Sequence, residues 1–427
     1  MSNRLNIVVL SEGYTSNQLA QFLVDATNAV NTLLSHPPYH EYRNYVNAFA
    51  IKVASTDSGS DHPFYGISRN TYFNSTYDSS DYLITIPADS TGQGKVDALL
   101  QTFMPNCQLP VLLVNDLTEG GSDGFFKTAI VSIGGLAAEQ STGQPGIMSH
   151  ETGHVLANLG DEYTIPYPGF PDTEEPNTTQ QTNRTLIKWR AWIDASTTVP
   201  TPVTAGDGVV GLFQGAHYHT NGWYRPELNC VMGSLGIPFC SVCSEALVLA
   251  IYQHVRPVDG FSPASTNLSV STTQVLTFSL SLLQPATHNL DVQWLTNGVA
   301  RTGAINLSFT LLPQTLSFGS NRVSAVVKDN TSLVRNDPTN LLSQTVSWTI
   351  TNNIPQLHLD LPRWLTGGKF AFRVTGNASQ GFSIWGATSF GTWILLSTNS
   401  LVAGQFLYTN TGAANFPRRF FRAMTPP

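Results

Sequence analysis

The stretch "MSHETGHVLANLGDEY", residues 148–163, contains the pattern that decides how this chain is interpreted. It holds the motif HExxH, formed by His150, Glu151 and His154. Residues four apart on a helix share one face, so both imidazoles can reach a single metal ion. Glu151 lies about 100° further round the helix, where it can contact a metal-bound water without ligating the metal. The spacing therefore predicts a metal site with Glu151 as a general base.

A catalytic zinc site needs a third protein ligand and an open position. After His154 an apolar helix face leads to Gly160, which we expect to end the helix in a left-handed cap. Asp161 follows this break directly, where the reversing chain has the shortest path back to the histidines. We therefore predict Asp161 as the third ligand. The alternatives that the sequence leaves open are Glu162, His217 and His219.

Three further residues near the motif have predicted roles. With Asp161 on the metal, Glu162 would accept a hydrogen bond from a ligand histidine. The downstream segment "GWYRPELNCVMGSLGIPFCSVC" contains Tyr224, whose phenol is a candidate for stabilising a developing oxyanion. Met232, in the same segment, is a candidate for a methionine turn beneath the metal. For both Tyr224 and Met232, an ordinary place in the hydrophobic core is the alternative.

The composition of the chain narrows the class of protein. The chain has 427 residues, of which 41% are hydrophobic and 11% are charged, and its net charge is −7. Globular proteins usually contain about 25% charged residues, so this composition suits a secreted, strand-rich protein better than a cytosolic helical one. The negative charge argues against a nucleic-acid partner, because phosphate binding needs clustered Lys and Arg. No apolar run is long enough to span a membrane, and no signal peptide is visible.

The four cysteines are unevenly placed. Cys107 stands alone, whereas Cys230, Cys240 and Cys243 lie close together. This arrangement permits one disulfide with a thiol left over, a pairing with Cys107, or a structural zinc at Cys240 and Cys243. A single CxxC does not decide among them.

The chain up to residue 258 alternates strand and helix patterns, which is typical of a sheet with helices packed on it. The predicted strands are "NIVVL", "NAFAIKVAS", "PVLLVN" and "TAIVSIGG". Helices are predicted at "KVDALLQTFM", at "SEALVLAIYQHV" and, for the motif, near residues 145–159. Another helix begins at a capping box of Thr15 and Gln18 and has an apolar face made by Leu19, Phe22, Leu23, Ala26, Val30 and Leu33. Residues 164–222 are rich in Pro, Thr, Gly and Asn, and we expect a long irregular excursion.

The chain beyond residue 258 shows short β-rich runs at regular spacing. The runs "LTFSLSL", "LDVQWLTNG", "INLSFTL", "NRVSAVVKD" and "QTVSWTI" predict an Ig-like β-sandwich over residues 259–353, with Trp294 inside. "TNNIP" is expected to be a linker, and residues 354–427 a further β-rich domain. The predicted fold is therefore multidomain: an α/β (α+β) zincin-like catalytic domain over residues 1–258, followed by two β-rich domains.

Several further blocks follow one another in a familiar order. They are "IVVLSEGYT", "STDSGSD", "VLLVNDLTEGGSDG", "EPNTT", "KWRAW", "YRPELNCVM" and "PFCSVC". Together with the opening stretch, they resemble the igalysin family of bacterial secreted zinc peptidases over residues 4–250. The resemblance implies a metzincin-like enzyme that holds Zn²⁺ through His150 and His154, with Glu151 as the catalytic glutamate and Met232 as the turn methionine. An acidic–glycine–tyrosine turn of the family corresponds to Glu12, Gly13 and Tyr14.

The C-terminal residues, ending in "RRFFRAMTPP", resemble a unit common in secreted proteins of environmental bacteria, which implies export or surface display. The leading hypothesis is a secreted or cell-surface zinc endopeptidase that hydrolyses proteins or glycoproteins. A competing hypothesis is a surface adhesion or binding protein with a structural or vestigial metal site. Glu151 favours the enzyme, because a structural site has no use for a general base. A zinc hydrolase acting on a non-peptide amide is a third reading that the sequence leaves open.

Overall fold

The computed structural model describes residues 3–124, 127–272, 274–354 and 357–425. The chain divides into two compact units. Unit 1 comprises Met1–Gly260, Ser281–Asp291 and Val327–Gln344, and unit 2 comprises Phe261–Leu280, Val292–Val326 and Thr345–Pro427. The protein is thus multidomain and mixed α/β, with many sheets and few helices, as predicted. The predicted boundaries after residues 258 and 353 stay predictions, and the predicted linker ends at Pro355, outside the described residues.

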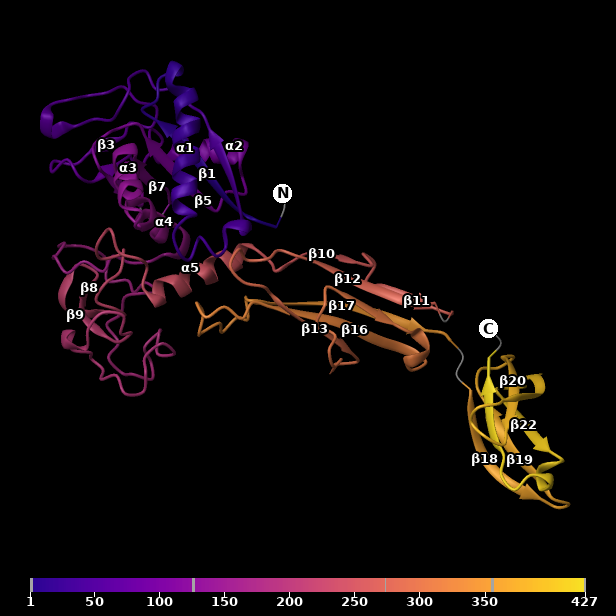
Figure 1. Ribbon diagram of the computed structural model, residues 1–427. Helices are drawn as coiled ribbons and strands as arrows, with labels where there is room; N and C mark the ends of the chain where they lie inside the picture. The colour runs from indigo at the N-terminus through magenta and orange to yellow at the C-terminus, as the bar shows by residue number, and fades with distance from the viewer. Residues whose placement is uncertain (1–2, 125–126, 273, 355–356, 426–427) are drawn as a thin grey trace. The chain divides into compact units, whose positions relative to one another are not determined.

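Unit 1 is built on a five-stranded sheet with the order β2-β1-β5-β7-β6 (Figure 1). Its strands are β1 (Leu5–Glu12), β2 (Val46–Ile51), β5 (Leu109–Val114), β6 (Gly121–Ser122) and β7 (Ala129–Ser132). Four of them run parallel, and β6 lies antiparallel to β7 at one edge. β1 is buried along its whole length. Parallel strands covered on both faces have nearly continuous apolar sequences, which is why "NIVVL" predicts a buried strand.

The helices of unit 1 cover both faces of this sheet. They are α1 (Leu19–Leu33), α2 (Gln93–Phe103), α3 (Ile133–Thr142), α4 (Ile147–Ala157) and α5 (Ser241–His254). Leu5, Ile7 and Val9 of β1 share one core with α1, α4 and α5. The alternate residues Val8 and Leu10 share a second core with α2. The side-chain alternation of one strand therefore divides the helices between two layers.

The N-terminal helix begins as the sequence predicts. The capping box of Thr15 and Gln18 is present, at a short 3₁₀ turn, η1 (Ser16–Gln18), that leads into α1. Most of the predicted apolar face of α1 is in the core, but Leu23 is exposed. The predicted face was therefore one residue too wide.

The segment "TAIVSIGG" was predicted to be a single strand, and this prediction is wrong. β7 stops at Ser132, whose hydroxyl accepts a hydrogen bond from the Gly135 backbone N–H and caps α3. A Cβ on Gly135 would lie 2.7 Å from Cγ2 of Ile147, so glycine lets α3 pack against the start of α4. The glycines in this segment made a helix look unfavourable in the sequence, but they allow close packing in the structure.

The motif helix is α4, and it ends earlier than predicted. Its left-handed cap is Asn158, with φ 52°, and not Gly160. Asn tolerates this conformation better than most other residues with a Cβ. Gly160 is needed for another reason: a Cβ there would lie 2.5 Å from Oε2 of Glu175. The Asn177 side chain accepts from the Gly160 N–H at 2.7 Å and donates to its C=O at 2.8 Å.

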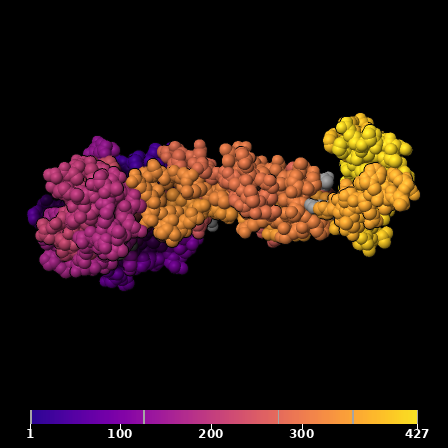
Figure 2. Space-filling model, turned by 90° about the horizontal axis from the view of Figure 1, so that it is seen from below, coloured from indigo at the N-terminus to yellow at the C-terminus, as the bar shows by residue number. Residues whose placement is uncertain are grey.

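The segment after α4 is largely irregular, as predicted, and forms a continuous magenta surface on unit 1 (Figure 2). Its one hairpin consists of β8 (Phe213–Ala216) and β9 (His219–Arg225). The other short elements of unit 1 are β3 (Thr76–Tyr77), β4 (Ile84–Thr85), η2 (Arg43–Tyr45), η3 (Pro63–Tyr65) and η4 (Val203–Ala205).

The two later segments of unit 1 join its core through Asp329. Oδ2 of this buried carboxylate accepts hydrogen bonds from the hydroxyls of Tyr42, at 2.8 Å, and Tyr252, at 2.6 Å. Oδ1 accepts from Nε2 of His288 and from the backbone N–H of Thr331, both at 2.8 Å. Both carboxylate oxygens are therefore satisfied by protein donors.

The strands that follow form further antiparallel and mixed sheets. One is β10 (Val258–Ser262), β12 (Leu276–Leu282) and β15 (Ser308–Leu311). Another is β11 (Asn267–Val270), β17 (Ser343–Asn352), β16 (Gly319–Lys328), β13 (Asp291–Thr296) and β14 (Val299–Ala300). Trp294 is fully buried, as predicted, and stacks on Trp348 with ring centroids 5.8 Å apart.

The last part of unit 2 contains two three-stranded sheets. They are β18 (His358–Leu365), β19 (Lys369–Thr375) and β22 (Gln405–Asn410), and β21 (Ile394–Ser400), β20 (Gly381–Ala387) and β23 (Phe420–Met424). Phe372, Val374, Phe382 and Ile384 form their shared core. The 3₁₀ turns of this half of the chain are η5 (Pro313–Thr315) and η6 (Ala413–Asn415). Among the described residues, no helix is both long and apolar enough to cross a membrane.

Candidate metal centre

The helix that carries the HExxH motif is held by hydrogen bonds to its first turn and by packing against neighbouring elements. Glu139 of α3 accepts hydrogen bonds from the backbone N–H of Met148 at 2.9 Å and the hydroxyl of Ser149 at 2.7 Å. This carboxylate satisfies orphan donors in the first turn of α4 and complements the helix dipole. α4 also packs against α5, β5 and β7, so most of its residues are buried. Side chains on such an element are positioned more accurately than side chains on a loop.

Backbone carbonyls orient both histidines of the motif. Nδ1 of His150 lies 2.9 Å from the carbonyl oxygen of Val231, and Nδ1 of His154 lies 2.6 Å from that of Leu159. A carbonyl only accepts, so each Nδ1 carries a proton and donates it. The Nε2 atoms then face each other at 3.0 Å. Two ring nitrogens at this distance cannot both carry a proton, and two lone pairs there favour a shared cation.

Asp161 completes a triangle with the two histidines. Its Oδ1 lies 3.1 Å from Nε2 of His150 and 3.4 Å from Nε2 of His154. Among the described residues, no hydrogen-bond partner satisfies this buried oxygen. Ligand atoms bound tetrahedrally to one zinc at about 2.0–2.1 Å lie about 3.3 Å from each other. The three donor atoms therefore fit a single zinc ion.

The pKa shifts of the three residues in this triangle also favour a positive charge between them. Burial opposes charge on His154, but the Asp161 carboxylate raises the pKa of His154 to about 9. The pKa of His150 is also raised, because its contact with Asp161 outweighs burial. Burial would raise the pKa of Asp161, yet the two histidines hold it well below its usual range. The site is thus electrostatically suited to positive charge between these three side chains.

Glu151 lies beside the triangle. Its carboxylate and the ring nitrogens of His150 and His154 include atoms within 4.8 Å of one another. A Cβ on Gly121 of β6 would lie 2.9 Å from Oε1 of Glu151, so the glycine leaves room for this carboxylate. Burial raises the pKa of Glu151 to about 8, and the carboxylates of Asp161 and Asp123 add to the shift. A pKa near neutrality is suited to proton transfer.

Met232 lies under the motif helix, where a turn methionine was predicted. It is fully buried, and its Sδ would lie 3.1 Å from a Cβ on Gly153, the residue that directly precedes His154. Its carbonyl accepts from the backbone N–H of Glu162 at 2.8 Å. The neighbouring residue Val231 supplies the carbonyl that orients His150. This turn therefore supports the site from below.

Other predicted candidates have different partners. Glu162 binds neither motif histidine: its Oε1 accepts from Nδ2 of Asn177 at 2.9 Å and lies 3.6 Å from Sγ of Cys243. His217 stacks on Trp223 at 3.9 Å between ring centroids and pairs with Glu175 at 3.0 Å. His219 bonds through Nδ1 to the His217 carbonyl at 2.5 Å. The predicted hydrogen bond from a ligand histidine to Glu162 is wrong, because carbonyls already accept both Nδ1 protons.

Tyr224 is not brought into contact with the histidines in the described part of the chain. Its backbone pairs with Thr179, and its side chain packs against the main core. Tyr218 reaches the site instead, and its hydroxyl donates to Oδ2 of Asp161. The role of Tyr224 stays a prediction without a supporting contact.

The turn that presents Tyr218 is unusual. His217 and Tyr218 have φ values of 54° and 56°, the signs of a type I′ hairpin turn that normally uses Asn or Gly. Two backbone bonds hold this turn to the motif loop: His217 N–H to Asp161 O and Tyr218 N–H to Tyr163 O, both 2.9 Å. Non-glycine residues in such conformations cluster at functional sites. The only signal in the sequence was the tyrosine between the two histidines of "GAHYH".

Aromatic rings surround this part of the site. Tyr163 stacks on His150 with ring centroids 5.9 Å apart. Phe170 and Tyr167 lie against Tyr218, at 4.6 Å and 5.7 Å between ring centroids. The irregular segment after α4 therefore supplies an apolar wall beside the polar triangle.

The Glu12–Gly13–Tyr14 turn serves the scaffold. Glu12 is buried and accepts from the backbone N–H groups of Phe73 at 3.0 Å and Ser75 at 2.9 Å. Gly13 has φ 68° and lies against Gly59, where no Cβ would fit. The Tyr14 hydroxyl donates to Oδ2 of Asp25 at 3.0 Å. This turn fixes a loop at the carboxyl end of β1.

Comparison with known protein families identifies the family to which this chain belongs. A family of peptidases, described as IgA Peptidase M64, has a model that matches residues 1–208 and 204–251. These matches span more than half of the chain and include the motif helix, Asp161 and the Met232 turn. The chain therefore belongs to the IgA peptidase M64 family, which confirms the resemblance drawn from the sequence.

Other comparisons add little. No curated protein matches the chain. Among solved structures, a β-glucuronidase 3 of Bacteroides uniformis matches at 9% identity and a TM-score of 0.15, covering 48% of this chain and 27% of that enzyme. A chaperone–tip adhesin complex of CFA/I fimbriae matches at 10% identity and a TM-score of 0.16, covering 39% of this chain and 92% of that one. At these TM-scores neither structure supports an argument about fold or function.

Proposed function

We propose that this peptidase is a zinc-dependent endopeptidase whose metal ligands are His150, His154 and Asp161. The observation that supports this most directly is the triangle of donor atoms at 3.0, 3.1 and 3.4 Å. Zinc with three protein ligands supplies a Lewis acid and a water of lowered pKa. The carboxylate oxygen of Asp161 without a hydrogen-bond donor is the kind of group that such an ion satisfies.

Glu151 is the proposed general base. Its carboxylate accepts the proton of the attacking water and passes it to the leaving amine of the cleaved peptide bond. Its position next to the two histidines, in a buried site, gives it the reach for these two transfers.

Tyr218 is proposed to position Asp161. Its hydroxyl donates to Oδ2, which leaves Oδ1 directed at the histidines. Hydrogen bonds of this kind orient metal ligands and raise their affinity for the ion. The strained hairpin turn that holds Tyr218 is consistent with this role.

The substrate is proposed to be a protein or glycoprotein, cleaved outside the cell or at its surface. The low content of charged residues and the strand-rich chain beyond unit 1 support a secreted protein. We further infer an Ig-like sandwich over residues 259–353 and a separate β-rich domain over residues 354–427. Both would bring the catalytic residues, all of which belong to unit 1, to a surface.

A combined metal and activity measurement tests this function. We expect the full chain to bind zinc, to cleave an unfolded protein substrate, and to lose both properties at the histidine site in His150→Ala and in His154→Ala. His219→Ala is the matched control, since this half-exposed histidine lies outside the triangle. A zinc-loaded chain that cleaves no peptide in a diverse library would favour the surface-binding protein instead.

A further inference from the structure

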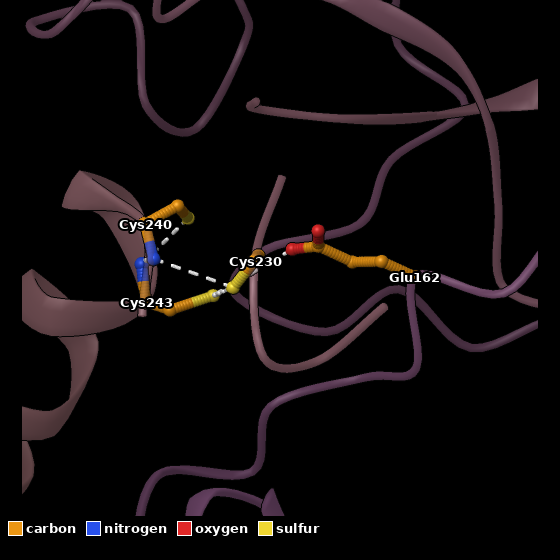
Figure 3. A group of neighbouring side chains, drawn as sticks. All are labelled: Glu162, Cys230, Cys240 and Cys243. Carbon is orange, nitrogen blue, oxygen red and sulfur yellow. Dashed lines mark hydrogen bonds between the residues drawn. The ribbon is translucent and has the colours of Figure 1, made fainter. Parts of the chain in front are cut away.

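A second cluster of metal-binding side chains lies behind the motif loop in unit 1. Cys230, Cys240, Cys243 and Glu162 are all buried, and their ligand atoms lie within 4.8 Å of one another. Figure 3 shows the cysteine side chains and the Glu162 carboxylate converging from three segments of the chain. The cluster shares no residue with the histidine triangle. We refer to it as the cysteine cluster.

The distances in this cluster match tetrahedral zinc. Sγ of Cys230 lies 3.7 Å from Sγ of Cys243, which lies 3.6 Å from Oε1 of Glu162. Zinc bonds of about 2.3 Å to sulfur and about 2.0 Å to oxygen place two sulfurs about 3.8 Å apart, and a sulfur and an oxygen about 3.5 Å apart. A disulfide needs sulfurs at about 2.05 Å. The described cysteines are all free thiols.

The Glu162 carboxylate supports a cation independently of the thiols. Glu162 is nearly fully buried, and its Oε2 has no hydrogen-bond partner among the described residues. Its Oε1 accepts from Asn177 at 2.9 Å, which fixes the carboxylate toward the sulfurs. A buried carboxylate with one unsatisfied oxygen is costly unless a cation compensates it.

Backbone groups favour thiolates at the same place. Cys240 is the N-cap of α5, and its Sγ accepts from the N–H of Cys243 at 3.4 Å. Sγ of Cys230 accepts from the N–H of Cys240 at 3.3 Å. The N-terminus of a helix and hydrogen bonds from N–H groups both stabilise a thiolate, which is the form that binds metal. The local fold thus supplies backbone donors to the sulfurs of Cys230 and Cys240.

From this convergence we propose that Cys230, Cys240, Cys243 and Glu162 bind a second, structural zinc ion. Four protein donors would close the coordination sphere, which is the arrangement of a structural zinc site. Soft thiolate donors in a tetrahedral set select zinc over the hard cations magnesium and calcium. The site goes beyond the proposed peptidase centre and does not depend on it.

The structural zinc would support the histidine triangle through the turn that follows Cys230. That turn carries the Val231 carbonyl, which accepts from His150, and the Met232 carbonyl, which accepts from Glu162. Fixing Cys230 at one end and Glu162 at the other fixes both carbonyls. A zinc ion in the cysteine cluster would therefore help to hold His150, a proposed ligand of the other zinc, in its orientation.

The test uses the full chain with the histidine triangle removed. We expect two zinc ions per chain in the wild type and one in the double variant His150→Ala/His154→Ala, measured by elemental analysis after exhaustive dialysis. X-ray absorption of that variant should give zinc–sulfur distances of about 2.3 Å. Adding Cys243→Ser should release the remaining zinc at least tenfold faster to a chelator. Cys107→Ser is the matched control and should retain it, because Cys107 lies in the other core.

Either of two results would overturn the proposal: a double variant without zinc and with reactive thiols, or a disulfide within the cluster by peptide mapping. If Cys243→Ser fails to fold, the absorption spectrum of the double variant decides by itself. Loss of peptidase activity in the double variant with one sulfur-bound zinc retained would separate the two sites. A wild-type chain that retains sulfur-bound zinc but cleaves no peptide would refute only the proposed function.

Discussion

The histidine triangle and the cysteine cluster start from neighbouring residues but are built differently. Asp161 turns toward two nitrogens, and Glu162 toward three sulfurs. The triangle offers three donors, with Glu151 alongside and Asp161 partly open to solvent. The cysteine cluster offers four donors, all buried. The number of protein donors and the presence of a base, more than the residue types, distinguish a reactive metal site from a structural one.

The sharpest test of this comparison is Glu151→Gln. An amide cannot accept a proton, so we expect peptide hydrolysis to fall by roughly 10²- to 10⁴-fold. Zinc content should stay unchanged, because Glu151 ligates nothing in either proposed site. Steady-state kinetics and elemental analysis of the same preparation check both expectations. Full activity with zinc bound would show that another group is the base, and that the triangle differs from the cysteine cluster in donor number alone.

The next largest effect is expected for Tyr218→Phe. Removing the hydroxyl that bonds to Oδ2 of Asp161 should weaken zinc binding at the triangle by about 10- to 100-fold. Competition with a chromogenic chelator measures this change, and the zinc of the cysteine cluster should be affected far less. Tyr224→Phe is the control, and we expect wild-type affinity from it. A loss of turnover in Tyr224→Phe alone would restore the role that the sequence assigned to Tyr224.

Asp329 provides a buried carboxylate that needs no metal. Two tyrosines, a histidine and a backbone N–H satisfy both of its oxygens, unlike Oδ1 of Asp161 and Oε2 of Glu162. In Asp329→Asn an amide group faces donors, so unit 1 should lose about 2 kcal/mol of stability without losing zinc. Hydrogen exchange of α5 in urea measures this. Asp360→Asn, at an exposed pair with Arg373, should change stability far less, because solvent screens such a pair.

His62 lies between two carboxylates, away from the histidine triangle. Its substitution is expected to have the smallest effect of those considered, a pH-dependent change in stability. Nδ1 donates to Asp81 at 2.6 Å and Nε2 to Asp116 at 3.0 Å, so the ring carries its own positive charge. Burial opposes that charge, but the two carboxylates raise the pKa of His62 above its usual value. A raised pKa in the folded state stabilises the protein below the unfolded pKa of about 6.5, and this contribution is lost as pH rises through the folded pKa.

The pH dependence of His62→Gln checks this sign. The stability difference between wild type and variant should be largest at about pH 6 and should shrink toward about pH 9. A difference that grows with pH would show that His62 is neutral in the folded protein.

Local patterns predicted much of this molecule, and long-range packing decided the rest. The spacing of His150 and His154 is a local signal, and it brings their rings together on α4. The apolar run of β1 is another, and that strand is buried as predicted. The sequence argument placed Asp161 near the histidines, and it lies there. Its premise that Gly160 ends the helix was wrong, because α4 ends at Asn158. An asparagine in the left-handed region has a weaker sequence signature than a glycine. The helix α3 was missed because its glycines look like a loop.

The remaining residues could not be found from sequence spacing. Tyr218 reaches Asp161 only because the β8–β9 hairpin docks on the motif loop. The cysteine cluster needs Glu162 from one segment and three thiols from another, and a lone CxxC carries no information about the carboxylate. Such groups meet through tertiary structure, so their signal lies in the fold and not in the local pattern.

The adjacency of Asp161 and Glu162 also has a thermodynamic consequence. Under the proposed assignments, one peptide bond joins a ligand of each metal, so ordering this loop for one ion lowers the cost of ordering it for the other. Such coupling is reciprocal: the factor by which the first ion tightens the second equals the factor by which the second tightens the first. The two ions would then load cooperatively, and chelating one would loosen the hold on its neighbour.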